Sequence, residues 1–282
     1  MQAAQTGNTA PLLKLADGGN ADAQYYAGVM FIFGSKMVLK DAARGCAYEE
    51  KASKTRGDAM HLTGMCHQSG ADGRPDLPKA EAAYRRAAEM GFIKSKCALG
   101  QILMADPPRA KEGLELCEAA GKAGDVEAQL AVANAYFAGA AGKSPDLGQA
   151  RWWYEKAASQ NSPNAMRRLG EMYARGDGGP KDTKKAIQLW TAAEQAGDPL
   201  VAILMADQLF AEMTGGRKPG PGTYGFRGGV PVADIEVVEQ WYKLAQAKDP
   251  RPDVQERARY GLAILANFKT AAGVSAKRTN RR

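Results

Sequence analysis

The sequence of 282 residues holds few of the side-chain patterns that enzymatic chemistry requires. None of its serines is followed by a lysine three residues later, so the Ser-x-x-Lys nucleophile pattern is absent. The pattern His-Glu-x-x-His, a phosphate-binding loop and the pattern Gly-x-Ser-x-Gly are absent as well. Glu49 and Glu50 are adjacent, so on a helix they would face apart and could not work as an acid–base pair. We therefore predict a protein that is not an enzyme and has no catalytic residue and no cofactor.

Both histidines of the chain lie in one stretch with soft metal ligands, AMHLTGMCHQSG. His61 and Met65 are four residues apart and would share a helix face, whereas Cys66 and His67 would not lie on that face. Such ligands suit copper(I). However, no acidic partner or second cluster accompanies them, and methionine commonly fills gaps between packed helices. We therefore predict no metal site, with a copper carrier as the alternative.

The sequence also repeats itself about every 35 residues. One pattern recurs throughout: an aromatic residue, Ala-Ala, a break, and then Ala-x-x-x-Leu-Gly. It is clearest in RWWYEKAASQNSPNAMRRLG, residues 151–170. The first alanine of the pair is predicted at Ala16, Ala52, Ala87, Ala120, Ala157, Ala192 and Ala245, and only the last step is much longer than the others. Such a period is typical of stacked helix pairs.

Each copy reads as two amphipathic helices around one break. Residues 125–137, for example, place Ala, Leu and Tyr at the i, i+3, i+4 and i+7 spacing of a helix. A small residue recurs in mid-helix, at Gly28, Gly64, Gly100, Ala133, Gly170, Ala206 and Ala263. A mid-helix glycine costs about 1 kcal/mol relative to alanine. We therefore expect a neighbouring helix to pass close to these positions.

These units resemble Sel-one-like repeats, a branch of the tetratricopeptide-repeat superfamily. The family pattern, Ala-x-x-aromatic-Tyr-x-x-Ala-Ala-x-x-Gly followed by Ala-x-x-x-Leu-Gly-x-Met-Tyr-x-x-Gly-x-Gly, is matched nearly position by position by RWWYEKAASQN with AMRRLGEMYARGDGG. The resemblance covers about residues 10–270. One copy replaces Met-Tyr with Cys66-His67, and the copy at 98–107 lacks the Gly-x-Gly loop. The resemblance implies an all-α fold, a right-handed α-solenoid of about six to seven helix-turn-helix repeats.

The resemblance further implies that the first helices line a concave face and that the protein holds other proteins. In each first helix, the residue before Leu-Gly and the residue after the glycine should point to that face. The predicted partner-binding residues are Tyr26, Val29, Leu62, Met65, Gln101, Asn134, Arg168, Glu171 and Asp207. They are apolar in the N-terminal half and polar or charged in the C-terminal half. An exposed apolar stripe marks a contact site; the alternative is that a tightly curled array buries these side chains in its core.

An insertion at about 213–231 lengthens one repeat, and it is the second candidate for partner contact. It contains Arg217, Tyr224, Phe226 and Arg227 among glycines and prolines, and aromatic and arginine residues are the preferred anchors of interfaces. The alternative is a flexible linker. Its sequence GPGTYG has the letters of a dinucleotide-binding loop, but no predicted strand precedes it, so we reject that interpretation.

The four cysteines form two pairs with the same spacing, Cys46 with Cys66 and Cys97 with Cys117. The second pair falls on the two helices of one unit, so a Cys97–Cys117 disulfide is feasible in an oxidising compartment. Four cysteines allow three connectivities, and reduced, buried thiols are an equally ordinary outcome. Cysteine-rich members of the family carry a pair in most units, which this chain does not.

Composition and charge restrict the class of partner. The formal net charge is +7, but the last six residues, KRTNRR, contribute four of these charges, and the rest of the chain carries mixed signs. We therefore expect no nucleic-acid partner, and a small-molecule ligand is disfavoured. No stretch approaches the ~20 apolar residues of a membrane span, so we expect no membrane insertion. We divide the chain into an extension (1–9), one repeat array (10–271) and a basic, disordered tail (272–282).

The start MQAAQTGNT lacks the features of a signal peptide. We favour a periplasmic protein whose signal peptide has been removed and to which Met1 was added, because the cysteine count is even; the alternative is the cytoplasm. The predicted function is a scaffold, adaptor or regulator that binds a partner protein through the concave face and the insertion. One alternative is a periplasmic immunity or inhibitor protein that neutralises a toxic enzyme. A second is a β-lactam-interacting or other hydrolase, which the missing nucleophile pattern disfavours.

Overall fold

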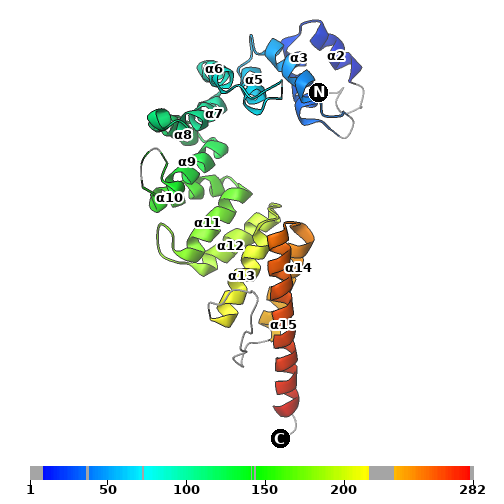
Figure 1. Ribbon diagram of the computed structural model, residues 1–282, viewed down its shortest axis with the longest axis vertical. Coiled ribbons are helices and arrows are strands. Elements are labelled where there is room, and N and C mark those ends of the chain that lie inside the picture. Colours follow the sequence, from blue (N-terminus) through cyan, green and yellow to red (C-terminus); the bar gives the residue numbers. More distant parts are fainter. Residues whose placement is uncertain are drawn as a thin grey trace. The chain divides into compact units, whose positions relative to one another are not determined.

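The computed structural model describes residues 9–35, 38–71, 73–140, 142, 144–215 and 232–279, and these residues are helical with no strand among them. The chain divides into two compact units, Met1–Asp146 and Leu147–Arg282. Each unit is a series of helices in which each helix packs against the next along the chain (Figure 1). Within the described ranges there are 14 α-helices and one short 3₁₀-helix, as the predicted all-α repeat fold requires.

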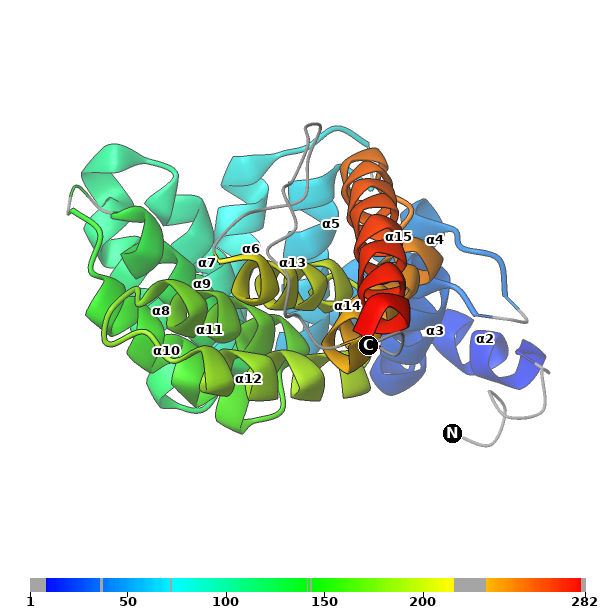
Figure 2. The same cartoon turned by 90° about the horizontal axis from the view of Figure 1, so that it is seen from below.

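Unit 1 begins with a single short helix and continues with helix pairs; Figure 2 shows the same elements from a second direction. Its helices are α2 (Ala10–Asp17), α3 (Ala21–Phe33), α4 (Ala42–Ala52), α5 (Gly57–Ser69), α6 (Leu77–Glu89), α7 (Ile93–Met104), η1 (Pro107–Arg109), α8 (Ala110–Lys122) and α9 (Val126–Ala138). The most extensive contacts join α3 to α4, α5 to α6, and α7 to α8. These are the first and second helices of three consecutive repeats.

Unit 2 contains the remaining helices, which are α10 (Leu147–Ser159), α11 (Pro163–Arg175), α12 (Thr183–Gln195), α13 (Val201–Thr214), α14 (Val232–Lys248) and α15 (Pro252–Thr279). Here α11 packs on α12, and α14 packs on both α13 and α15. Helix α15 continues to Thr279, past residue 271, where we placed the end of the array. No helix in the described part of the chain is long and apolar enough to cross a membrane.

The helix ends follow from local sequence. Several second helices begin after an aspartate whose carboxylate accepts the backbone N–H three residues later, as Asp41 does from Arg44 and Asp182 does from Lys185. Such N-caps satisfy a helix N–H that has no partner within the helix. Several first helices end at a glycine in the left-handed conformation, including Gly70, Gly139 and Gly176. Aspartate before a second helix and glycine after a first helix therefore set the length of each repeat.

The recurring alanine marks the core of each unit. Six of the seven predicted positions, Ala16, Ala52, Ala87, Ala120, Ala157 and Ala245, are fully or almost fully buried. At the seventh position the first alanine of the pair, Ala192, is only partly buried, and the second, Ala193, is the buried alanine of α12. Both members of the Ala-Ala pair are small, so sequence spacing alone could not separate them.

The mid-helix glycines allow close helix approach, as the sequence predicted. The prediction is wrong at Ala263, which is exposed; Gly261 of α15 is the residue that lies against the Tyr242 ring. A Cβ atom on Gly64 of α5 would lie 2.6 Å from the Tyr84 ring of α6, and one on Gly170 of α11 would lie 2.7 Å from the Trp190 ring of α12. Both distances are shorter than real contacts of a Cβ atom, so only glycine fits there. Each aromatic residue lies three positions before the buried alanine of its own helix. We call this position the ring slot.

The ring slot has different occupants in the two units. In unit 2 it holds Tyr154, Trp190 and Tyr242, and all three side chains are buried. In unit 1 it holds Glu49 in α4, Tyr84 in α6 and Cys117 in α8. Two second helices of unit 1 therefore lack the aromatic ring.

Candidate partner-binding surface

Helix α3 presents the most apolar part of the predicted surface. Its sequence, ADAQYYAGVMFIF, is apolar on all sides, so packing on α2 and α4 leaves apolar side chains at the surface. Tyr26 is 45% exposed, Val29 is half-buried, and Phe33 is exposed one turn further on. Asn20 caps the helix by accepting the N–H of Ala23, which fixes where this stripe begins.

The following first helices continue the surface with fewer apolar groups. Met65 of α5, Gln101 of α7 and Asn134 of α9 are exposed, as predicted. Leu62 is only 8% exposed and belongs to the buried interior, so we leave it out of the surface. The position before Leu-Gly thus points inward in α5, although the equivalent Tyr26 points outward in α3.

Met65 and Gln101 line one cavity of about 380 Å³ in unit 1, together with His61, Tyr84, Lys94 and Asp125. Burial, with the Lys94 charge as a second cause, lowers the pKa of His61 to about 4, so its imidazole is neutral at physiological pH. The His61 Nδ1 lies 2.9 Å from the Ser95 Oγ, and the imidazole packs on Phe92 and Tyr84. The contact of Ser95 with His61 was not predicted, because it joins two repeats.

The Ser95–His61 pair is not arranged for hydrolysis. Ser95 is completely buried, so its hydroxyl cannot reach a substrate. Within the described residues, no three His, Cys, Asp or Glu side chains come together as metal ligands would. We therefore treat the cavity as a surface for polar and apolar contacts.

Unit 2 carries the charged part of the predicted surface. Arg168 of α11 is exposed, and Glu171 and Asp207 are partly buried. Glu171 lies within ion-pair distance of three arginines, with separations of 3.3 Å to Arg167, 3.7 Å to Arg168 and 3.7 Å to Arg175. The carboxylate is therefore balanced by charges of its own helix.

Glu171 and Asp207 line a second cavity of about 220 Å³, which also contains Trp190 and Arg257. Asp207 forms an ion pair with Arg257 of α15 and accepts a hydrogen bond of 3.0 Å from the Tyr242 hydroxyl. Arg257 comes from a helix 50 residues away in sequence, so the repeat pattern gave no reason to include it.

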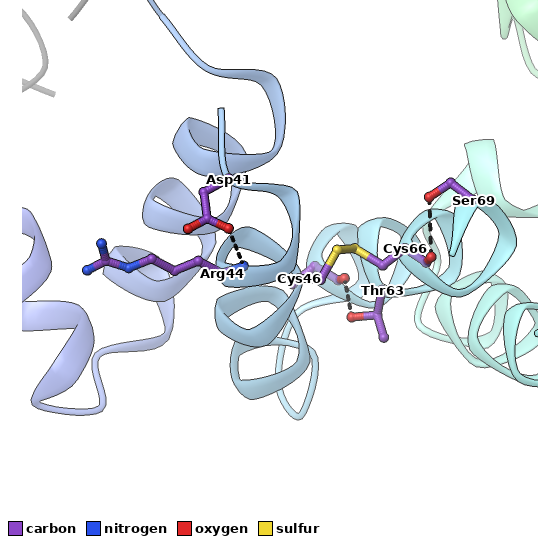
Figure 3. The surroundings of a disulfide bond; sticks show 7 residues. Asp41, Arg44, Cys46, Thr63, Cys66 and Ser69 are labelled. Carbon is purple, nitrogen blue, oxygen red and sulfur yellow. Dashed lines mark hydrogen bonds between the residues drawn. A yellow bond between two sulfur atoms is a disulfide. The ribbon is translucent and has the colours of Figure 1, made fainter. Parts of the chain in front are cut away.

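Both cysteine pairs are disulfides, and both lie in unit 1. Cys97–Cys117 joins α7 to α8 within one repeat, as the sequence suggested was feasible, and Cys46–Cys66 joins α4 to α5 across two repeats. Figure 3 shows the second bridge between the two helices, with Asp41 capping the start of α4. Helices α4 and α8 are the second helices whose ring slot holds no aromatic ring, because Glu49 and Cys117 occupy it. Two disulfides fit an oxidising compartment.

Glu49 is the functional candidate that the sequence analysis missed. Its side chain is 0% exposed, and neither carboxyl oxygen has a side-chain hydrogen-bond partner; the Val29 backbone N–H of α3 is near enough to favour the charged form. Its Cδ lies 2.6 Å from where a Cβ of Gly28 would be, so the carboxyl fills the ring slot against α3. Burial, reinforced by the Asp58 charge, raises the pKa of Glu49 to about 9. The available signal was that four of the aligned copies carry Tyr or Trp at this position, namely Tyr84, Tyr154, Trp190 and Tyr242.

Four predicted residues lie outside the described part of the chain. These are the insertion residues Arg217, Tyr224, Phe226 and Arg227. Their contribution to partner binding stays a prediction.

Comparison with known proteins identifies the repeats. The Sel1 repeat family matches residues 21–54, 57–92, 126–162 and 163–198, slightly more than half of the chain. Among curated proteins, the chain is 28% identical over 130 residues to chitin synthase regulatory factor 3 of Schizosaccharomyces pombe, and 26% identical over 152 residues to an uncharacterized protein of Neisseria meningitidis serogroup B. These matches cover 45% and 53% of this chain but only 14% and 32% of those relatives.

Solved structures show the same fold. A protective antigen of uropathogenic Escherichia coli strains, described as having an SLR fold, superposes with a TM-score of 0.64 over 90% of this chain and 50% of its own, at 21% identity. A Sel1 repeat protein of Oxalobacter formigenes gives 0.59 over 83% of this chain and 88% of its own, also at 21% identity. An immunity protein of Pseudomonas aeruginosa gives 0.50 over 83% of each chain at 18% identity.

The family match, the recurring Gly-to-ring contacts and the consecutive helix pairs agree with one another. The chain is a member of the Sel1 repeat family, with a fold of the tetratricopeptide-repeat kind.

Proposed function

We propose that this protein is a non-enzymatic scaffold that binds a partner protein through the exposed residues of its first helices. The observation that carries the proposal is helix α3, which is apolar on all sides and yet leaves Tyr26 and Phe33 exposed. A helix of that composition is normally buried, so its outer stripe is suited to cover by another protein. Met65 and Gln101 extend the surface within unit 1.

The partner contacts in unit 2 are polar under this proposal. Arg168 is exposed and only loosely paired with Glu171, so it is free to turn toward an acidic group of a partner. We propose the insertion residues Arg217, Tyr224, Phe226 and Arg227 as further contacts. We also propose a periplasmic location, which the two disulfides support.

The test uses the full chain as bait in an envelope fraction of the source cells, followed by mass spectrometry of the captured proteins. The double variant Tyr26→Asp with Met65→Asp should capture the partner at least tenfold less well, because it places charges on the apolar stripe. Leu39→Asp is the matched control, since Leu39 is exposed and lies outside the helices. Equal capture by the parent and the double variant would show that this surface is not the binding site.

The alternative is an immunity or inhibitor protein that neutralises a toxic enzyme. It is favoured by the immunity protein of Pseudomonas aeruginosa, which has the same fold over most of both chains. In that case the captured protein is an enzyme, it binds one-to-one with nanomolar affinity, and its turnover stops on binding. A captured protein whose activity is unchanged by saturating amounts of this chain would exclude inhibition and leave the scaffold.

A further inference from the structure

The buried carboxyl group of Glu49 distinguishes the helix pair α3–α4 from the other helix pairs. Tyr84 and Trp190 occupy the same ring slot, and each satisfies its polar atom: the Tyr84 hydroxyl donates to Gln68 Oε1 at 2.8 Å, and the Trp190 Nε1–H donates to the Arg167 carbonyl at 3.1 Å. Glu49 has no comparable partner: neither oxygen meets a side-chain donor, and the Val29 backbone N–H lowers its pKa less than burial raises it. A buried polar group without a partner is costly, and a buried carboxylate costs far more than a neutral carboxyl group.

The charged and titratable groups that face Glu49 do not offset this cost. Tyr25 of α3, Arg56 before α5, and Asp58 of α5 act on it electrostatically. Arg56 is held by Asp58 in two hydrogen bonds of 3.0 and 2.6 Å, pairs with Asp22, and lies over the Tyr25 ring. The guanidinium charge is thus neutralised by two carboxylates, and Asp58 adds repulsion to an ionised Glu49.

The Cys46–Cys66 disulfide determines which helix is displaced when Glu49 ionises. Cys46 lies one helical turn before Glu49 on α4, and its bridge to Cys66 ties α4 covalently to α5 (Figure 3). No disulfide joins helix α3 to α4. The two helices are held together by packing, including the Phe31 ring stacked on Tyr48 and the close contact of Gly45 with Ile32. Charge at Glu49 would therefore loosen α3 from a fixed α4.

We propose that Glu49 is a proton-dependent latch: its carboxyl group binds a proton when α3 docks on α4. The helix that carries Tyr26 and Val29 is therefore held on α4 more stably at low pH than at high pH. The regulatory part of this inference rests on the proposed function, because α3 carries that surface. The proton linkage itself does not depend on any partner.

The direction of the pH dependence follows from the pKa of the carboxyl group in the docked and undocked states. In the undocked chain the group ionises near its ordinary value of 4.5, whereas docking raises the pKa to about 9. The docked state therefore holds one more proton between these values. The docked state is most stable below about pH 4.5. As the pH rises from there toward 9, the docking equilibrium constant falls by up to about tenfold per pH unit.

Amide hydrogen exchange of α3 in the unbound, oxidised protein tests the latch from pH 5 to pH 8, with rates corrected for intrinsic exchange. In the wild-type chain, protection of residues 23–33 should fall with pH. In Glu49→Gln and Glu49→Met the pH dependence should disappear, because neither side chain has a titratable group. Glutamine keeps the shape of the glutamate side chain, and methionine keeps its volume. Glu50→Gln is the matched control, because Glu50 is the exposed neighbour on the same helix and should keep the wild-type dependence.

The outcomes separate the latch from the proposed function. A pH dependence that persists in both Glu49 variants, or that is absent in the wild type, overturns the latch. If the latch is present, the partner captured through the Tyr26 surface should bind at least tenfold more tightly at pH 5.5 than at pH 8, and Glu49→Met should remove that difference. Binding that is equal at both pH values in the wild type overturns the regulatory role. A failure to capture any partner would count against the proposed function while the exchange result still decides the latch.

Discussion

The two units hold their helix pairs together by different means. In unit 2, every second helix fills its ring slot with a large aromatic side chain, Tyr154, Trp190 or Tyr242. In unit 1, only α6 does so, with Tyr84; α4 has Glu49 and α8 has Cys117. Those two helices are the second helices that carry a disulfide. Where the slot has no aromatic ring, the second helix instead carries a disulfide: Cys117 of α8 bonds to α7 of its own repeat, whereas Cys46 of α4 bonds to α5 of the next repeat.

The exposed surfaces of the two units also differ in polarity. Unit 1 exposes apolar side chains on α3 and α5 and the neutral polar Gln101 on α7, whereas helix α11 of unit 2 exposes arginines paired with a carboxylate. Apolar contact gives affinity, and charge gives orientation and speed of association. The comparison suggests four measurements, which follow in order of decreasing effect.

Removing an aromatic ring from unit 2 should have the largest effect. Trp190→Ala deletes a buried ring that packs on Gly170 of the neighbouring helix, and no disulfide in this unit compensates for the cavity. We expect a loss of about 3–5 kcal/mol in the free energy of unfolding, measured by urea denaturation. Trp152→Ala is the control, because Trp152 is 44% exposed on α10 and should cost much less. Similar losses for both variants would mean that the ring slot is not what stabilises unit 2.

Removing the bridge beside Glu49 should come next. The double variant Cys46→Ser with Cys66→Ser opens a covalent loop with a sequence separation of 20 residues. The expected loss is about 3 kcal/mol from the freedom that the unfolded chain regains, seen as a lower urea midpoint for unit 1. Under reducing conditions the wild-type chain should approach the midpoint of a variant that lacks both bridges. A wild-type chain whose midpoint does not respond to reductant would contradict the idea that disulfides replace the rings.

Replacing the buried acid should stabilise unit 1 rather than weaken it. Glu49→Met removes a carboxyl group whose pKa is raised to about 9, so at pH 8 it should increase the free energy of unfolding by about 1–3 kcal/mol. At pH 5 the gain should shrink, because the wild-type carboxyl group is protonated in the folded state and the pH is close to its ordinary pKa of 4.5 in the unfolded state, so burying it then costs little. Thermal denaturation at the two pH values gives the result. Destabilisation at both values would show that Glu49 makes a favourable contact instead.

The smallest effect is expected at the charged surface of unit 2. Arg168→Ala breaks an exposed ion pair with Glu171 whose atoms are 3.7 Å apart, so the free energy of unfolding should change by less than about 0.5 kcal/mol. A change above 1 kcal/mol in urea denaturation would assign Arg168 to the structure of unit 2 and not to its binding surface.

Much of this architecture was predictable from the sequence. The period near 35 residues and the mid-helix glycines predicted helix pairs, because each feature is local to one repeat. The burial of Leu62, the register of Ala193 and the contact of Ser95 with His61 were not predictable, because each depends on how one repeat lies on the next.

The sequence by itself determined that this chain is a series of helix pairs with small residues where helices meet, since periodicity, capping and residue size act within about one repeat of chain. Only the tertiary structure decided which cysteines pair and that Glu49 is buried against α3 without a side-chain partner. The physical reason is that a carboxyl group in a repeat pattern looks like a solvent-exposed charge until the neighbouring helix is placed, and burial by that neighbour is what changes its protonation.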